Sequence, residues 1–156
     1  MKKSVFGAIV IATVLLFAGC GGGDLAGTDA NNNGVRDDVE DYIIKTYTEE
    51  KQRKAAMQSA RATQAVMLLD LSDKTTAKNK ALKVGDMETK AIHCLSLVFD
   101  PSYSEIVKGA ETLTQVSKKI DAITLNTKAR QKAYFEYNHL LDGTTVSLPR
   151  KDTCEK

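Results

Sequence analysis

Tryptophan is absent from this 156-residue chain, and aromatic residues make up only 6% of it. The core of a folded domain must therefore be built from aliphatic side chains and alanine. Histidine occurs only twice, which excludes a histidine metal cluster of recognisable spacing. No apolar and polar alternation is long enough for a sheet, and the chain has no phosphate-binding loop, nucleophile elbow or HExxH motif. We therefore expect an all-α protein that is not an enzyme.

The first 19 residues contain the successive parts of an export signal. "MKK" is a short basic head, and the apolar run that follows is shorter than a comfortable membrane span of about 20 residues. The run closes with "LFAGC", which resembles the lipobox of bacterial lipoproteins, with Phe17 where leucine is usual. This resemblance implies lipid transfer to the Cys20 thiol, cleavage before Cys20 and acylation of the new terminus. The alternative is an ordinary signal peptide, or an uncleaved anchor, with an incidental cysteine.

The lipoprotein interpretation divides the chain and places it in the cell. Residues 1–19 are the signal peptide, and residues 20–28 are a lipidated, glycine-rich tether. Several acyl chains on Cys20 would anchor the protein stably to a membrane, and Gly21 after the cysteine would permit export to the outer membrane, facing the periplasm. Cleavage lowers Lys+Arg from 22 to 20, which equals Asp+Glu at 20. A neutral mature chain gives no indication of a nucleic-acid partner.

The two remaining cysteines, Cys94 and Cys154, form an even pair in an oxidising compartment. We expect them to form a disulfide that ties the C-terminal tail to a helix of the domain. Two buried thiols, or one reactive thiol, are the alternative. The sequence around Cys94 also holds His93, but a zinc or redox role for this pair lacks further ligands of suitable spacing.

The stretch "DANNNGVRDDVE", residues 29–40, has oxygen-bearing side chains at regular intervals. It resembles the calcium loop of an EF-hand, with Gly34 at the sixth position. The resemblance implies a Ca²⁺ ion held by six residues: Asp29, Asn31, Asn33, Val35, Asp37 and Glu40. No entering helix precedes the loop, and its eighth position is Arg36 where paired EF-hands usually have an aliphatic residue. In these two respects it is more similar to the lone calcium loops of thrombospondin type 3 repeats and dockerin-like modules, which implies a metal that fastens a structure.

The same residues have a second interpretation that needs no metal. Asparagine-rich segments form Asx turns on their own. "DDVE" is also a good helix start, in which Asp37 would be the N-cap and Glu40 would complete a capping box. This alternative leaves Asp29 and the alternating oxygen groups before Gly34 without a role.

From residue 37 to the end, the chain predicts a bundle of four or five helices and then an extended tail. We expect helices over 37–47, 49–71, roughly 75–98 and about 127–141, and a further helix that starts at the proline after Asp100. Thr48, Asp73 and Thr127 are the predicted caps, and Gly143 is the predicted stop. The predicted core stripes are Val39, Ile43 and Tyr47; Ala56, Met57, Ala60, Met67, Leu68 and Leu71; Ala77, Ala81, Val84, Ala91, Leu95 and Val98; Ile106, Ala110, Leu113, Ser117 and Ile120; and Ala133, Tyr134, Tyr137, Leu140 and Leu141.

Two functional hypotheses follow. The first is a calcium-binding envelope lipoprotein whose helical domain, residues 37–156, is a binding or scaffolding module for a periplasmic or outer-membrane protein. The second is a periplasmic inhibitor or immunity-type lipoprotein that neutralises an enzyme or a toxin. We expect His139, which lies among tyrosines, to be a half-buried structural residue in either case.

Overall fold

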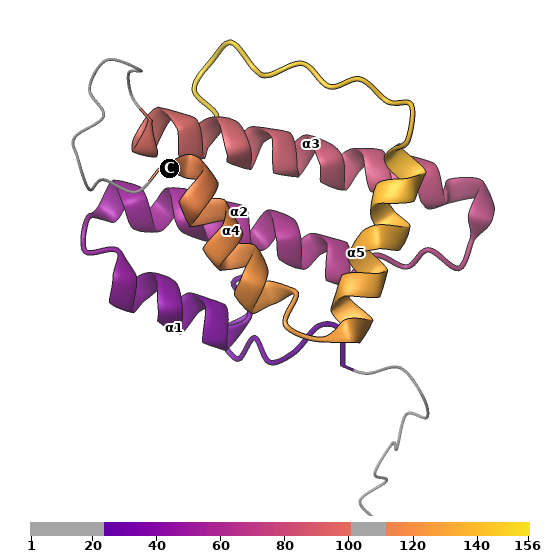
Figure 1. The fold of residues 1–156 in the computed structure, drawn as a ribbon, viewed down its shortest axis with the longest axis horizontal. Coiled ribbons are helices and arrows are strands. Elements are labelled where there is room, and N and C mark those ends of the chain that lie inside the picture. Colours follow the sequence, from indigo (N-terminus) through magenta and orange to yellow (C-terminus); the bar gives the residue numbers. More distant parts are fainter. Residues whose placement is uncertain (1–23, 101–111) are drawn as a thin grey trace, which may run out of the picture.

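The computed structural model describes residues 24–100 and 112–156, and all regular secondary structure in these ranges is helical. The five helices are α1 (Asp37–Thr46), α2 (Glu50–Met67), α3 (Lys74–Phe99), α4 (Leu113–Thr124) and α5 (Lys128–Leu141). Figure 1 shows α1, α2 and α3 running roughly alongside one another, with α4 and α5 crossing them. The predicted all-α bundle is confirmed.

Helix α2 is the centre of the bundle, because it contacts each of the other four helices. Its buried surface is made largely of small side chains, Ala55, Ala56, Ala60 and Ala62. Alanine is the best helix former, and its short side chain lets neighbouring helices approach closely. The small number of aromatic residues in the sequence is thus matched by close packing of helices around α2.

The apolar core consists of two clusters at different levels of the bundle. One joins α1 to α2, to the C-terminal part of α3 and to α4, where Ile43, Leu95 and Ile120 are fully buried. The other joins the end of α2 to α3 and α5 around Tyr137. The predicted apolar faces of α1 and α3 are confirmed, since every predicted position on them is buried except Val98, which is partly buried.

The limits of α2 differ from the prediction at both ends. Thr48 is not its cap: the N-cap is Glu49, with no side-chain hydrogen bond. The helix ends at Met67, so Leu68 lies beyond it and is 60% exposed, and Leu71 is only partly buried. The apolar periodicity continued past the helix because a hydrophobic residue in a connecting loop can match the pattern by chance.

Three other helices begin with a side-chain cap, two of them as predicted. Asp73 accepts a hydrogen bond from the Thr75 N–H at 3.0 Å, and Thr127 caps α5 by accepting from the Arg130 N–H at 3.2 Å. Helix α4 starts at a capping box formed by Thr112 and Gln115. The predicted first part of that helix, with Ile106 and Ala110, lies outside the described residues.

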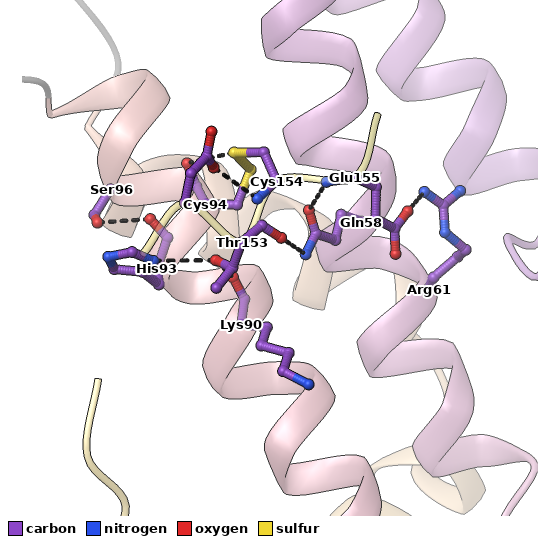
Figure 2. Close-up of a disulfide and its surroundings, with 10 residues drawn as sticks. Gln58, Arg61, Lys90, His93, Cys94, Ser96, Thr153, Cys154 and Glu155 are labelled. Carbon is purple, nitrogen blue, oxygen red and sulfur yellow. Dashed lines mark hydrogen bonds and ion pairs between the residues drawn. A yellow bond between two sulfur atoms is a disulfide. The ribbon is translucent and has the colours of Figure 1, made fainter. Parts of the chain in front are cut away.

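A disulfide joins Cys94 on α3 to Cys154 near the C-terminus, as the sequence predicted. Hydrogen bonds reinforce this attachment (Figure 2). The Thr153 hydroxyl donates to the Lys90 carbonyl at 2.8 Å, and the Gln58 amide donates to the Thr153 carbonyl at 2.9 Å. The tail therefore ends against α2 and α3, where the disulfide closes a long loop.

Replacing Cys154 with serine should lower the free energy of unfolding. The bridge spans a sequence separation of 60 residues. In the chain-entropy model, opening a loop of this length costs about 4 kcal/mol. Urea unfolding of the oxidised chain, of Cys154→Ser and of the Cys94→Ser/Cys154→Ser pair measures the difference. The double variant controls for the unpaired thiol, and a loss below about 1 kcal/mol in both variants would contradict the expectation.

Candidate metal centre

Residues 28–37 form a tight loop that leads directly into α1. The loop is closed by a hydrogen bond from the Asp37 N–H to the Thr28 carbonyl at 2.8 Å. Gly34 has a φ of +81°, in the left-handed region that glycine adopts without strain, and Asn32 has a φ of +56°. Gly34 also packs over Arg61, because a Cβ at this position would lie 3.4 Å from the arginine side chain. The glycine predicted for the sharp turn is therefore at a position that requires it.

The oxygen-bearing side chains of the loop fold toward its inside, where they accept hydrogen bonds from the backbone. Asp29 accepts from the Asn33 N–H at 3.1 Å and the Gly34 N–H at 2.9 Å, with one carboxylate oxygen each. Asn33 Oδ1 accepts from the Val35 N–H at 2.8 Å, and Asp37 Oδ1 accepts from the Ala30 N–H at 3.0 Å. These bonds hold the side chains on one side of the turn.

Glu40, on the first turn of α1, faces the loop across its open side. Its Oε2 accepts from the Asn31 amide at 2.9 Å, and its Oε1 accepts from the Asn33 amide at 2.8 Å. The capping box of the metal-free alternative, with Asp37 as N-cap, is not formed, because the N-cap of α1 is Arg36 and makes no side-chain cap hydrogen bond. Both oxygens of Glu40 are thus directed at the two asparagines.

The structure brings some of the six predicted ligands together more closely than others. Asn31, Asn33 and Glu40 are in direct contact, while Asp29 and Asp37 bond to the backbone of the same loop. Within residues 24–100 and 112–156, no three His, Cys, Asp or Glu side chains form a metal-binding group. Among the predicted ligands, the two asparagines therefore meet Glu40 through their amide nitrogens, and the three carboxylates do not gather at one point.

Arg36, which the sequence marked only as a departure from an EF-hand, joins the loop to the bundle. It is 4% exposed, and its guanidinium donates to the carbonyls of Ile123 at 2.7 Å and Thr124 at 3.1 Å, at the end of α4. It also donates to both Asp38 oxygens, and this hydrogen-bonded contact lowers the pKa of the Asp38 carboxyl. A fixed cation at a helix C-terminus is favoured by the helix dipole and by the carbonyls left free there.

The preceding residues, 24–28, are held against the bundle. Arg130 on α5 donates to the carbonyls of Leu25 at 3.1 Å and Asp24 at 2.9 Å, and Gln64 on α2 donates to the carbonyl of Ala26 at 2.5 Å. Gly27 has a φ of +70° and lies so close to Arg36 that a Cβ would overlap its side chain. The predicted glycine-rich tether is thus part of the folded domain from Asp24 onward.

Replacing Arg36 with methionine should destabilise the fold. Methionine keeps much of the buried volume, but two carbonyls at the end of α4 lose their donor, which costs about 2 kcal/mol. Arg36→Lys keeps the positive charge but lacks the planar guanidinium group with its several N–H donors. Its free energy of unfolding should therefore lie between those of the wild type and of Arg36→Met. Urea unfolding of the three proteins measures the effect. A methionine variant as stable as the wild type would show that the contact with α4 contributes nothing.

A second polar site lies inside the bundle, between the two apolar clusters. It is a cleft of about 70 Å³, and among the described residues that line it there is no lysine or arginine. Glu88 accepts hydrogen bonds there from the hydroxyls of Tyr137 at 2.7 Å and Tyr134 at 3.3 Å. Asp121 accepts from the hydroxyls of Thr63 at 3.3 Å and Ser117 at 3.4 Å. Sequence reasoning missed this cluster because its members come from four helices.

Burial raises the pKa of both carboxyls in the cleft. The hydrogen bonds from the two tyrosines oppose this effect at Glu88, and the nearby charge of Asp121 adds to it. At Asp121 the hydrogen bonds from Thr63 and Ser117 likewise oppose the effect of burial. In turn, burial and the Glu88 carboxylate raise the pKa of the hydroxyls of Tyr134 and Tyr137. The cleft therefore disfavours negative charge.

The two histidines lie outside both sites. His93 contacts the Thr153 hydroxyl through Nδ1 at 3.0 Å, and its neighbour Cys94 is held in the disulfide. His139 pairs with Asp142 at 3.2 Å and has an exposed side chain, so its predicted half-buried position is wrong. It lies on the outer face of α5, opposite the buried Tyr137.

Replacing Glu88 with glutamine should stabilise the protein at pH 7. The pKa of Glu88 is raised in the folded state, so the folded protein binds this proton more tightly than the unfolded chain does. Its contribution to stability therefore falls as the pH rises from the unfolded pKa near 4.5 through the raised folded pKa. Glutamine removes this penalty and keeps partners for both tyrosines.

The gain in midpoint temperature over the wild type should thus be largest at neutral pH and should shrink as the pH falls toward 4.5. Thermal unfolding across this range measures it. Glu136→Gln on the exposed face of α5 is the matched control and should show no such dependence. A gain for Glu88→Gln that stays constant with pH would contradict the electrostatic cause.

Cys20, the predicted lipidation site, lies outside the described residues. Among the helices of the described part of the chain, none has the length and apolar character needed to cross a bilayer. Comparisons with protein-family models, with curated proteins and with solved structures find no match to this chain.

Proposed function

We propose that this chain is a calcium-binding lipoprotein of the bacterial cell envelope, in which the ion braces a helical binding module. The observation that carries the calcium proposal is the position of Glu40. Both of its oxygens face Asn31 and Asn33 across the loop, and the capping box that would explain Glu40 without a metal is not formed. A bidentate glutamate opposite alternating oxygen donors is the arrangement that calcium uses in such loops.

The residues present fit a hard cation. The amide N–H groups of Asn31 and Asn33 occupy the side of Glu40 where a cation would lie, and turning either amide would present its oxygen instead. Asp29 and Asp37 bring further carboxylate oxygens from the same loop, and Val35 offers its backbone carbonyl. Calcium accepts six to eight oxygen ligands with mixed charge and flexible geometry. It would supply here a cross-link between the loop and the start of α1.

The surroundings favour a structural ion over a sensor. Val35, in the middle of the loop, is fully buried in the apolar cluster that contains Ile43 of α1, and Arg36 binds the end of α4. Paired EF-hands transmit calcium binding by moving helices, whereas this loop is already fixed to the core at two consecutive residues. The ion would therefore stabilise the edge of the bundle, with an affinity of about 10⁻⁵ to 10⁻³ M.

The proposed anchor would hold this edge close to a membrane. With lipid on Cys20 and the chain docked on the bundle from Asp24, only residues 20–23 separate the two. Four residues span at most about 14 Å. We place the protein at the outer membrane, facing the periplasm, with an envelope protein as its partner. The alternative function, a periplasmic inhibitor, is favoured by one feature, the exposed segment before Cys154.

Thermal unfolding with calcium and with chelator tests the calcium proposal. Calcium at 100 times its dissociation constant should add about 2.7 kcal/mol, because it binds the folded protein and not the unfolded chain. This corresponds to a rise in midpoint of several degrees. Glu40→Gln should abolish the rise. Asp41→Asn, one residue further along α1 and outside the loop, is the matched control and should keep it. The same midpoint up to millimolar calcium would refute the site.

A further inference from the structure

The segment of residues 145–152, which we call the C-terminal strap, is held at both ends. At its start, the Thr144 N–H donates to the Leu141 carbonyl at 2.9 Å, directly after the turn at Gly143. At its end, Cys154 is bonded to Cys94, and Glu155 forms an ion pair with Arg61 (Figure 2). The strap is therefore a closed loop on the bundle.

Between these attachments the strap makes few contacts of its own. No backbone–backbone hydrogen bond to any other described residue involves residues 145–152. Val146 and Leu148 are 66% and 63% exposed, although both are apolar. Figure 1 shows the strap arching away from α3. Its backbone donors and acceptors are thus available for pairing with another extended chain.

The sequence of the strap, TVSLPRKD, narrows the kind of partner. Side chains two residues apart lie on one side of an extended chain, which groups Val146 and Leu148. The chain then bends at Arg150 and Lys151. Pro149 restricts the backbone next to Arg150. The strap carries Arg150, Lys151 and Asp152, a net charge of only +1. This is far below the four to eight basic residues that mark binding to anionic lipid.

The position of the strap also favours a protein over a membrane. In Figure 1 the strap lies on the opposite side of the bundle from residues 24–36, where the proposed lipid anchor would attach. An anchored molecule would therefore present the strap away from the membrane surface. Its partner must then recognise an extended chain and one basic side chain.

We propose that the strap is a recognition loop for a serine endopeptidase with an acidic specificity pocket, and that Arg150 enters this pocket. Extended peptides bind through main-chain hydrogen bonds to an edge strand, and neighbouring pockets read alternate side chains. An aspartate at the base of the pocket selects arginine or lysine. A loop already held at both ends loses less conformational entropy on binding than a free peptide does.

The Cys94–Cys154 disulfide would keep the strap attached to the bundle even after an endopeptidase had cleaved it. Hydrolysis would add water across the Arg150–Lys151 bond, leaving a carboxylate on Arg150 and an ammonium group on Lys151. Residues 151–156 would stay attached through Cys154, so both new ends would remain close to the endopeptidase. This retention is typical of an inhibitor and is absent from a free peptide substrate. The proposal extends the inhibitor hypothesis and does not depend on calcium.

Competition with trypsin, used as the probe, tests this inference. The full chain with its disulfide intact is added to trypsin that hydrolyses a small chromogenic arginine substrate. Its inhibition constant should be at least about 10-fold lower than that of a linear peptide of residues 144–156, because the strap is preorganised. Arg150→Ala should raise this constant at least about 30-fold, as expected for a buried anchor side chain.

Two control variants separate the alternatives. Lys151→Ala removes a neighbouring basic group and should change the constant less than about 3-fold if Arg150 alone enters the pocket. Glu40→Gln should inhibit as well as the wild type, since no backbone hydrogen bond joins residues 145–152 to the described residues of the loop. A failure of the calcium proposal would leave this result unchanged.

Three outcomes would overturn the inference. The first is an inhibition constant for the full chain that is no lower than the inhibition constant of the linear peptide, which would make the strap an ordinary exposed loop. The second is competition that persists in Arg150→Ala. The third is binding to phosphatidylcholine vesicles with 30% phosphatidylglycerol that Arg150→Ala and Lys151→Ala weaken equally, without competition for trypsin. That result would assign the strap to a lipid surface.

Discussion

The buried guanidinium of Arg36 is the contact on which the N-terminal half of this structure depends. It joins the carbonyls at the end of α4 to the Asp38 carboxylate, and it passes beneath Gly27, where a larger residue would not fit. A charge is stable at such a depth only when all sides of it are paired. The loop, the start of α1, the end of α4 and residues 24–28 are consequently fixed as one unit.

This unit explains how the loop of residues 28–37 can be stable here without a partner loop. In paired EF-hands the position after the central ligand packs against a second loop, whereas here Arg36 binds the end of α4. The loop therefore needs no partner loop, and its oxygen groups are positioned by backbone hydrogen bonds to Asp29 and Asn33. The proposed ion would add to an arrangement that the bundle already supports.

The sites of the two proposed activities lie on different sides of the molecule. The proposed calcium loop and residues 24–28, next to the proposed anchor, lie at one side of the bundle, and the strap lies at the opposite side (Figure 1). The strap is closed by Cys154, by bonds to Gln58 and Lys90, and by the ion pair of Glu155 with Arg61, the residue over which Gly34 of the loop packs. Between them lies the cleft with Glu88, where charge is disfavoured.

The sequence by itself determined the features that depend on near neighbours along the chain. The faces of α1 and α3, the caps at Asp73 and Thr127 and the turn at Gly34 follow from spacings of a few residues. The Cys94–Cys154 disulfide was predicted from the oxidising compartment that the export signal implies and from the even number of cysteines that remain after Cys20. Only the tertiary structure decided the roles of Arg36, Arg130 and Glu88, and which way Glu40 points. Their partners lie on other helices or across a loop, and pairing at that distance depends on how the helices pack, which no local pattern encodes.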